Sequence, residues 1–417
     1  MSEPIFLGLK GDFPLWAQPE TTDLIYFDSA ATAQKPRVVI EAINSYYQIH
    51  TANIHRGVHR LAELSTSDWE DSRKIVADFF KADSSELIIT RNTTEALNGV
   101  AYGWADHNLK KGDYILTTVM EHHANLVPWQ QVCLRTGAKL LIAGVTQDGR
   151  LDEADWLEKL KTPGVKLVTF SHVSNVTGAV LPAKSLTKLI RKIQPAARVV
   201  LDAAQSAPHV PVNFTDLGVD FLAFSGHKMY GPMGIGGLFV KKALLDSGEF
   251  QPWLFGGGMI DEVWPETATF NPDPAERFTA GTPDVASLVG LAAAVKYLEN
   301  IGLPEIVEHE RELINEAYER LKVLPEIHLI GPDPSCHKRV GSIAFIYKGV
   351  HAHDVAQVME SQNLAVRSGH HCAMPLHLDQ GWTATTRISF GVYNNNTELD
   401  RLVAAIKKVG QVLKPNS

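Results

Sequence analysis

Seven apolar segments, each followed by a longer polar or amphipathic stretch, constrain the fold of this chain more than any other feature. Short continuous apolar runs are typical of strands buried on both faces, and most of the segments between them have helix length. Buried strands separated by helices predict an α/β fold with a mostly parallel sheet that helices cover on both sides. The predicted strands are residues 86–90, 114–118, 139–145, 165–172, 198–202, 221–224 and 237–240.

The rest of the chain has a different order of elements. Residues 256–283 carry a glycine run, several prolines and acidic residues, which predict an ordered connecting loop. Two helices are predicted next, and then strands and helices in mixed order, which favour a smaller α+β domain. We therefore expect a large α/β domain over residues 24–283 and a smaller domain made of residues 1–23 and 284–417.

Composition narrows the class of protein. The 417 residues are 45% hydrophobic and carry a net charge of −8, so a nucleic acid or an anionic membrane is not indicated as a partner. No apolar run approaches the ~18 residues of a membrane span, and the N-terminus lacks the layout of a signal peptide. Because three cysteines without a CxxC pair favour a reducing compartment, we expect a cytoplasmic protein.

A lysine follows one of the buried strands directly. The apolar run 219–224 leads into Ser225-Gly226-His227-Lys228, and a Gly-Pro turn comes soon after. Lysine is seldom buried without a reason, and a partly dry amine has a depressed pKa and can form a Schiff base with an aldehyde cofactor. A solvated lysine after a strand is the alternative that this motif alone leaves open.

An aspartate ends the preceding strand in the same way. Asp202 closes the segment 198–202, where a buried carboxylate needs a partner for its charge. A protonated pyridine nitrogen would supply that partner and would hold the ring as an electron sink. An aspartate that only caps the following helix is the alternative. One crossover between the two motifs would let Asp202 and Lys228 meet the same ligand.

Three further polar motifs follow predicted strands. Residues 91–95 combine a helix start with threonine hydroxyls, which predicts an anion site or a plain helix cap. His122, after the second strand, could stack on a flat ring or relay protons, although ordinary loop histidines are commoner. Asn175 offers a donor and an acceptor, or is simply the asparagine of a turn before glycine.

A cysteine motif lies in the second half of the chain. Cys372 follows Arg367, His370 and His371 in a polar loop, a setting that could lower the pKa of a thiol from its usual ~8.5. A metal site is disfavoured because adjacent residues of an extended loop point in opposite directions. Arg387 is a charge within a strand pattern and is expected to hold a carboxylate, either of the protein or of a substrate.

Taken together, these motifs resemble the pyridoxal-phosphate cysteine desulfurases of the group II, SUF-type branch within the class-V aminotransferase family. This branch also contains enzymes similar to selenocysteine lyase. The resemblance covers about residues 20–410 and implies the type I fold of pyridoxal-phosphate transferases. DAAQ and SGHK are typical of the wider cofactor family, and RSGHHCAMP singles out the desulfurases. The motifs are NIHRGVH, RNTTE, EHHANLVPW, SNVTG, DAAQ, SGHKMYGP, AGTP, RSGHHCAMP and TRISFGVYN.

The resemblance assigns a cofactor role to several residues. Lys228 matches the Schiff-base lysine, Asp202 the partner of the pyridine nitrogen, and His122 the histidine stacked on the ring. Thr282 matches a phosphate contact from the second subunit of a homodimer, although Phe255 departs from the family's glycine run near that interface. The other cofactor contacts implied are Gln205 at the ring oxygen and Thr94, Ser225 and His227 at the phosphate.

The resemblance also implies the reaction. The expected activity converts L-cysteine to L-alanine and leaves the sulfur on Cys372 as a persulfide, for iron–sulfur cluster assembly. Arg387 and Asn175 match groups that hold the substrate carboxylate, and Arg56 and Arg367 match arginines that line the substrate pocket. His353 resembles a residue of members that deliver sulfur to a zinc-containing, scaffold-like acceptor. Selenocysteine lyase, another β-lyase or aminotransferase, and a non-catalytic scaffold are the rival functions.

Overall fold

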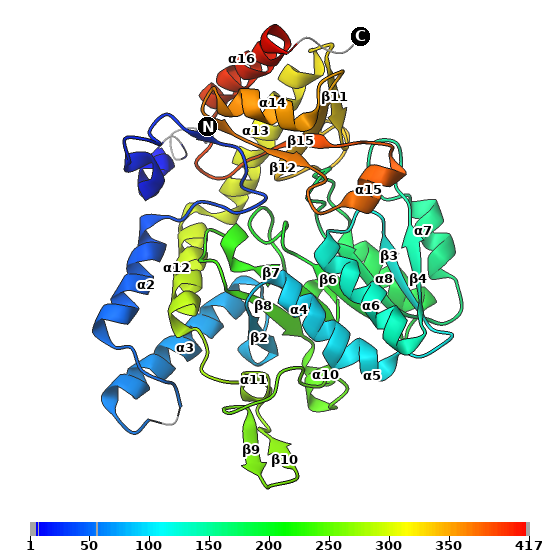
Figure 1. The fold of residues 1–417 in the computed structure, drawn as a ribbon. Coiled ribbons are helices and arrows are strands. Elements are labelled where there is room, and N and C mark those ends of the chain that lie inside the picture. Colours follow the sequence, from blue (N-terminus) through cyan, green and yellow to red (C-terminus); the bar gives the residue numbers. More distant parts are fainter. Residues whose placement is uncertain (1–5, 7, 56, 414–417) are drawn as a thin grey trace.

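The computed structural model describes residues 6, 8–55 and 57–413 (Figure 1). A seven-stranded sheet in the order β2-β8-β7-β6-β5-β3-β4 forms the centre of its larger part. All strands run parallel except β8, which is antiparallel to both of its neighbours. The prediction of a mostly parallel sheet is thereby confirmed. The strands are β2 (Leu87–Thr90), β3 (Tyr114–Thr118), β4 (Lys139–Ala143), β5 (Val165–Ser171), β6 (Arg198–Asp202), β7 (Phe221–Ser225) and β8 (Gly236–Val240).

Two hydrophobic clusters cover the two faces of this sheet. Leu222 and Phe224 of β7 belong to one cluster, and Phe221 and Ala223 belong to the other, because side chains alternate along a strand. The first cluster includes residues of α2, α3, α7, α8 and α12, and the second includes residues of α4 and α6. These helices are α2 (Arg37–Ile49), α3 (Arg60–Phe79), α4 (Thr93–Val100), α6 (Val127–Thr136), α7 (Glu153–Leu160), α8 (Ala183–Ile193) and α12 (Val285–Ile301).

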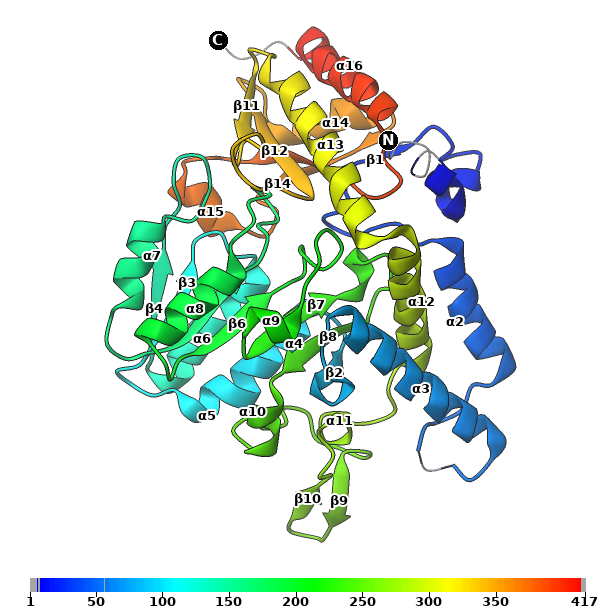
Figure 2. The same ribbon diagram turned by 180° about the vertical axis from the view of Figure 1, so that it is seen from behind.

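A second sheet, β11-β12-β15-β14, lies above the first in Figure 1 and is entirely antiparallel. Helix α12 packs against α2 and α3 (Figure 2), and α13 continues from it toward this second sheet. The short strand β1 (Ile25–Tyr26) pairs with β13 (Leu364–Ala365). The remaining elements here are β11 (Ile327–Ile330), β12 (Ser342–Tyr347), β14 (Arg367–Gly369), β15 (Thr385–Ser389), α13 (Leu303–Lys322), α14 (Ala352–Glu360), α15 (Met374–Asp379) and α16 (Asn396–Val412).

Several local predictions were wrong. The segment expected to be a connecting loop contains the hairpin β9 (Ile260–Val263) and β10 (Ala268–Phe270), which projects from the lower end of the molecule in Figure 1. Strand β11 and helix α15 lie where no element was predicted. The helix start expected within residues 91–95 begins α4 at Thr93, but a π turn at Ala101–Ala105 follows that helix. Short segments such as these gain their stability from tertiary packing, which local sequence patterns do not report.

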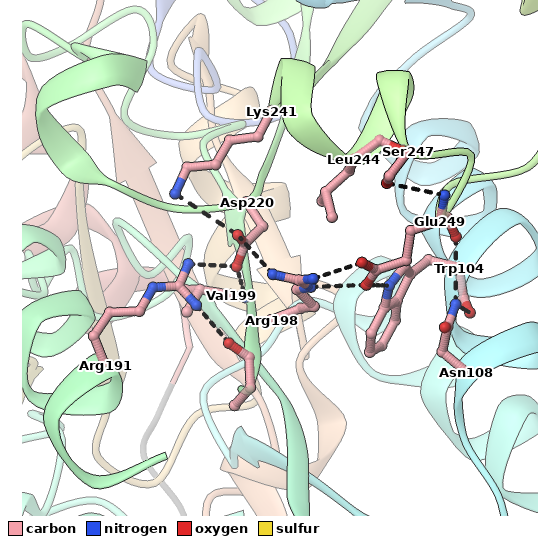
Figure 3. A network of polar contacts seen from close by, with 11 residues as sticks. Trp104, Asn108, Arg191, Arg198, Val199, Asp220, Lys241, Leu244, Ser247 and Glu249 are labelled. Atoms are coloured by element: carbon pink, nitrogen blue, oxygen red, sulfur yellow. Dashed lines mark hydrogen bonds and ion pairs between the residues drawn. The ribbon is translucent and has the colours of Figure 1, made fainter. Parts of the chain in front are cut away.

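A buried carboxylate, Asp220, lies at the amino-terminal ends of β6 and β7, and Figure 3 shows the network of polar contacts around it. Asp220 accepts hydrogen bonds from Arg191 Nη2 at 2.5 Å and from the Val199 N–H at 2.7 Å. Arg198 and Lys241 are further cations within 4 Å of its oxygens, and Arg198 also pairs with Glu249 at 2.6 Å. This network fixes the register of two central strands.

Among the described residues, no single helix is long and apolar enough to cross a membrane. Taken together, α12 and α13 are long and apolar enough by length and composition alone, but the two helices are bent by 75° relative to each other.

Candidate active site

The polar motifs meet at one cavity of about 290 Å³ at the carboxyl ends of the large sheet. This is where ligands bind in open α/β sheets. The loops after β2, β3, β5, β6 and β7 supply most of its walls, and β14, β15 and the loop before α15 close it. Its lining includes Asn92, Thr93, Thr94, His122, Asn175, Asp202, Gln205, Ser225, His227, Lys228, Arg367, His371, Cys372 and Arg387.

Lys228 ends a 3₁₀ turn that follows β7 directly. Its side chain is half-buried and lines the cavity, and no hydrogen bond to its Nζ occurs within the described part of the chain. Burial lowers the pKa of Lys228 to about 8, although the charge of Asp202 opposes this change. A substantial fraction of the amine is therefore neutral, and nucleophilic, near pH 8.

Asp202 and Gln205 face the cavity from the loop that starts at the end of β6. Asp202 is 5% exposed, and its Oδ1 accepts one hydrogen bond, from the Ala204 N–H at 2.9 Å. Burial raises the pKa of this carboxyl, so a cationic partner in the cavity would be favourable. Gln205 Nε2 donates to the Ala30 carbonyl at 2.8 Å, which orients the amide.

The start of α4 forms an anion cradle. Asn92 caps the helix by accepting from the Glu95 N–H at 2.9 Å, and Ser225 Oγ accepts from the Thr93 N–H at 2.9 Å. The N–H and hydroxyl of Thr94 line the cavity without a partner among the residues described. Burial lowers the pKa of His227 to about 4, so its ring contributes as a neutral donor. Thr93, which the sequence motif did not single out, ties Ser225 to this cradle.

His122 lies on the wall formed by the loop after β3. Its Nδ1 accepts from the Ala124 N–H at 3.0 Å, which leaves Nε2 to carry the ring hydrogen. Burial, helped by the charge of Lys228, lowers the pKa of His122 to about 3, so the ring is neutral. The sequence patterns did not indicate the neighbouring Glu121, a fully buried carboxyl that accepts hydrogen bonds from Thr118, Asn125 and Ser171.

The cysteine loop crosses above these residues in a strained conformation. His371 and Cys372 have φ values of 52° and 58°, in the left-handed region that non-glycine residues rarely adopt. Two hydrogen bonds from the segments that follow β5 and β3 hold the loop: Asn175 Nδ2 donates to the His371 carbonyl and the His123 N–H donates to the Cys372 carbonyl, both at 2.7 Å. Cys372 is exposed at the mouth of the cavity.

Two arginines share one carboxylate beside the cysteine loop. Arg367 binds Asp28 through Nε at 3.0 Å and through Nη2 at 2.8 Å, and Arg387 Nη2 lies 3.2 Å from the same side chain. Arg387 is 2% exposed and also donates to the Asn175 carbonyl at 2.9 Å. The expectation that Arg387 holds a carboxylate is met in this structure by Asp28, which sequence analysis did not identify.

The remaining predicted site residues lie elsewhere. Thr282 lines a second cavity of about 360 Å³, together with His55 and residues of the glycine run. His353 is exposed and its Nδ1 lies 2.7 Å from Ser368 Oγ, close to the cysteine loop. Arg56 lies outside the described residues.

Comparison with known proteins agrees with this geometry. The profile of the class-V aminotransferase family matches residues 25–402. A probable cysteine desulfurase 2 of Mycobacterium leprae is 45% identical over 96% of this chain and 95% of its own length. The apo cysteine desulfurase of Thermococcus onnurineus NA1 is 42% identical, with a TM-score of 0.91 over 97% of this chain and 98% of that chain.

A more distant solved structure, a C-DES mutant with glycine covalently linked to its PLP cofactor, is 26% identical. Its TM-score is 0.81 over 95% of this chain and 98% of that chain. From the family profile, the near full-length relatives and the shared fold, the chain belongs to the class-V aminotransferase family, among relatives that are named cysteine desulfurases.

Proposed function

We propose that this protein is a cysteine desulfurase, which converts L-cysteine to L-alanine and transfers the sulfur to Cys372 as a persulfide. One observation carries the proposal: Lys228, Asp202 and Cys372, from distant parts of the sequence, line the same cavity. A protein that only bound a metal or a partner would have no need of a half-buried amine of lowered pKa beside an exposed thiol.

Pyridoxal 5′-phosphate is the cofactor, and the residues of the cavity fit it. When bound, this group withdraws electrons from the α-carbon of an amino acid. Asp202 would hold the ring nitrogen, Gln205 the ring oxygen, His122 the ring face and Lys228 the aldehyde carbon. Thr94, Ser225 and His227 would hold the phosphate, at a helix start whose free N–H suits an anion.

Residues of the chain carry out the proton transfer and the sulfur transfer. The neutral amine of Lys228 takes the α-proton of the substrate, and His122 is placed to carry a proton within the same cavity. The thiolate of Cys372 then forms a bond with the substrate sulfur while the carbon–sulfur bond breaks. The electron pair of that bond stays with carbon, which is protonated and leaves as L-alanine.

The two arginines recognise the substrate carboxylate. Arg387 and Asn175 are bonded to each other and line the cavity, and Arg367 adds a second guanidinium. A planar guanidinium fork matches a carboxylate in two places. Both arginines already bind Asp28, so the substrate would insert beside the carboxylate of Asp28 or displace it. Arg56 is proposed as a further residue of this pocket from the family match alone.

We further propose a homodimer in which Thr282 reaches the phosphate of the other subunit. The position of Thr282 supports this proposal, because within one chain Thr282 lines a different cavity from the one that Lys228 lines.

The division of the chain into a domain of residues 24–283 and a domain of the remaining residues stays a proposal, as does a cytoplasmic location. An acceptor protein for iron–sulfur cluster assembly, zinc-containing and scaffold-like, would dock near His353, which contacts the strand that leads to Cys372.

The test is incubation with L-cysteine and a reductant, measuring sulfide and alanine. The wild type is expected to release both, whereas Cys372→Ala should lose sulfide release. Cys336→Ala is the matched control, because Cys336 is also exposed but lies outside the cavity. Unchanged sulfide release by Cys372→Ala would contradict the proposal, and pyruvate as the product would favour a β-lyase. Selenocysteine turnover that survives Cys372→Ala while cysteine turnover fails would favour a selenocysteine lyase.

A further inference from the structure

The segment of residues 28–35, between β1 and α2, supports the cavity from one side and is called the support segment below. Asp28 binds the two arginines of the substrate pocket, and the Ala30 carbonyl accepts from Gln205 Nε2 at 2.8 Å. The last residues of the support segment contact the 3₁₀ turn that ends at Lys228. The reaction described above gives these last contacts no task.

All of these contacts are made to one atom, the carbonyl oxygen of His227. This oxygen accepts from Lys35 Nζ at 2.8 Å, and from the Ala33 N–H and the Thr32 hydroxyl, both at 3.1 Å. A carbonyl oxygen has two lone pairs, so three donors occupy it fully. The amine of Lys35 makes the shortest of the three bonds, and its removal would therefore change the position of this oxygen most.

Lys35 is bound to backbone carbonyls rather than to an acid. Its Nζ also donates to the Ala33 carbonyl at 2.6 Å, and burial lowers the pKa of Lys35 to about 7. A neutral amine keeps two hydrogens, the number that the carbonyls of Ala33 and His227 require, so both bonds persist when the charge is lost. Lys35 is not among the residues that line the cavity, so it does not compete with Lys228 for the cofactor.

The turn that carries Lys228 is held at both of its ends. At its start, the Gly226 N–H donates to the carbonyl of Ile235, the residue before β8, at 2.9 Å. At its end, the His227 carbonyl is bound by the support segment, which fixes the peptide plane that leads into Lys228. Without Lys35, the end of the turn would lose its shortest bond to the rest of the protein.

The amine of Lys228 depends on this backbone for its direction. Lysine has a flexible stem of four carbons, and among the described residues no hydrogen bond holds the Nζ of Lys228. No side-chain contact therefore orients the amine before the cofactor arrives. Its approach to the cavity is set by the Cα of Lys228, which follows the fixed peptide plane directly.

We propose that Lys35 is a positioning residue for Schiff-base formation: by holding the His227 carbonyl, it directs the amine of Lys228 at the aldehyde carbon of pyridoxal 5′-phosphate. In that step Lys228 Nζ forms a carbon–nitrogen double bond with the aldehyde carbon, and the two hydrogens of the neutral amine leave with the aldehyde oxygen as water. Lys35 acts in this step and has no part in holding the phosphate. Its role rests on the function proposed above.

The test is Lys35→Met, which keeps the length of the side chain and removes its donors. We expect the full chain, stripped of cofactor, to form the Schiff base with pyridoxal 5′-phosphate about tenfold to 100-fold more slowly, because misplacement of a reacting group has effects of this size. Absorbance of the Schiff base measures the rate. Affinity for pyridoxine 5′-phosphate, which has the ring and the phosphate but no aldehyde, should stay within about threefold of the wild type. An unchanged rate, or an equal loss in rate and in this affinity, overturns the proposal.

Lys241→Met is the matched control, because Lys241 Nζ also donates to a backbone carbonyl, that of Gly218 at 2.8 Å, near the amino-terminal end of β7. It should form the Schiff base at the wild-type rate, and equal slowing in both variants overturns the proposal.

Thr32→Val removes a second donor to the His227 carbonyl and decides the question if Lys35→Met does not fold. It should slow the reaction by about twofold to fivefold, the usual effect of one hydrogen bond, and a wild-type rate would then overturn the proposal. A wild type that forms no Schiff base contradicts the proposed function itself, whereas a wild type that forms it no faster than Lys35→Met contradicts only the role of Lys35.

Discussion

Replacement of Gly236 by alanine should damage the cofactor site through backbone contacts alone. Gly236 lies in β8, between Thr90 of β2 and Ser225 of β7. A Cβ at this position would lie 2.5 Å from the Phe224 carbonyl oxygen and 2.9 Å from Asn92 Cα. Both atoms belong to the main chain, so neither can rotate away as the end of a flexible side chain could.

The size of the effect follows from these two distances. Restoring an ordinary contact near 3.4 Å requires a displacement of about 0.9 Å from Phe224 and about 0.5 Å from Asn92. Forced movements of this kind cost about 1–3 kcal/mol, whereas alanine in an open strand position would stabilise by roughly 0.5–1 kcal/mol relative to glycine. The displaced segments carry the anion cradle on one side and Lys228 on the other. Misplacement of a site by about 1 Å can cost about 10²-fold.

The assay is the dissociation constant of pyridoxal 5′-phosphate, measured by absorbance on protein stripped of cofactor, together with the midpoint of thermal unfolding. We expect Gly236→Ala to bind the cofactor about tenfold to 100-fold more weakly and to unfold at a lower temperature. Gly144→Ala is the matched control, because a Cβ there would meet only Asp155 Oδ2 at 3.7 Å. Wild-type affinity and stability in Gly236→Ala would refute the reasoning.

Three further predictions concern charges. The pKa of Lys228 is lowered to about 8, so its amine is protonated below that pH and neutral above it. The rate at which protein stripped of cofactor binds pyridoxal 5′-phosphate should therefore rise through about pH 8. A rise only near pH 10 would contradict this prediction. Glu121→Gln should lower stability by about 1–3 kcal/mol in urea unfolding, because its carboxyl receives three buried hydrogen bonds and an amide cannot accept them all; an unchanged midpoint would refute this. Asp220→Asn should lower the free energy of unfolding by about 2–4 kcal/mol, since Asp220 is 2% exposed and its loss leaves Arg191 without its carboxylate partner. Glu249→Gln, in a more exposed pair, should lower it clearly less. Equal losses of stability would mean that burial is not the cause.

The amino-acid sequence predicted the large sheet well because its strands are buried on both faces. Continuous apolar runs marked β3 and β6 at their observed bounds, and the polar residues directly after each strand marked the edge where the cavity lies. The same logic placed Lys228 and Asp202 together, since neighbouring parallel strands bring their carboxyl ends to one place. The hairpin of β9 and β10 was missed because its strands are short and mostly exposed, which leaves no apolar pattern.

Other features depend on contacts that only the folded chain creates. Asp28 became part of the site because Arg367 and Arg387 reach it from β14 and β15, more than three hundred positions away. The sequence motif does not distinguish Thr93 from Thr94. Only the position of Ser225 in the folded chain, against Thr93, separates the two residues. The need for glycine at position 236 likewise comes from Phe224 and Asn92, two neighbours across the sheet.

The sequence by itself determined which chemical groups this protein has and at which strand ends they stand, because the periodicity of apolar residues is a local property. The tertiary structure decided which of these groups are buried, which are paired, and which nitrogen of each histidine ring carries the hydrogen. The ring of His122 shows the difference, since its Nδ1 accepts from the Ala124 N–H and its Nε2 therefore carries the hydrogen. Protonation and burial depend on neighbours in space, and the fold alone brings those neighbours together.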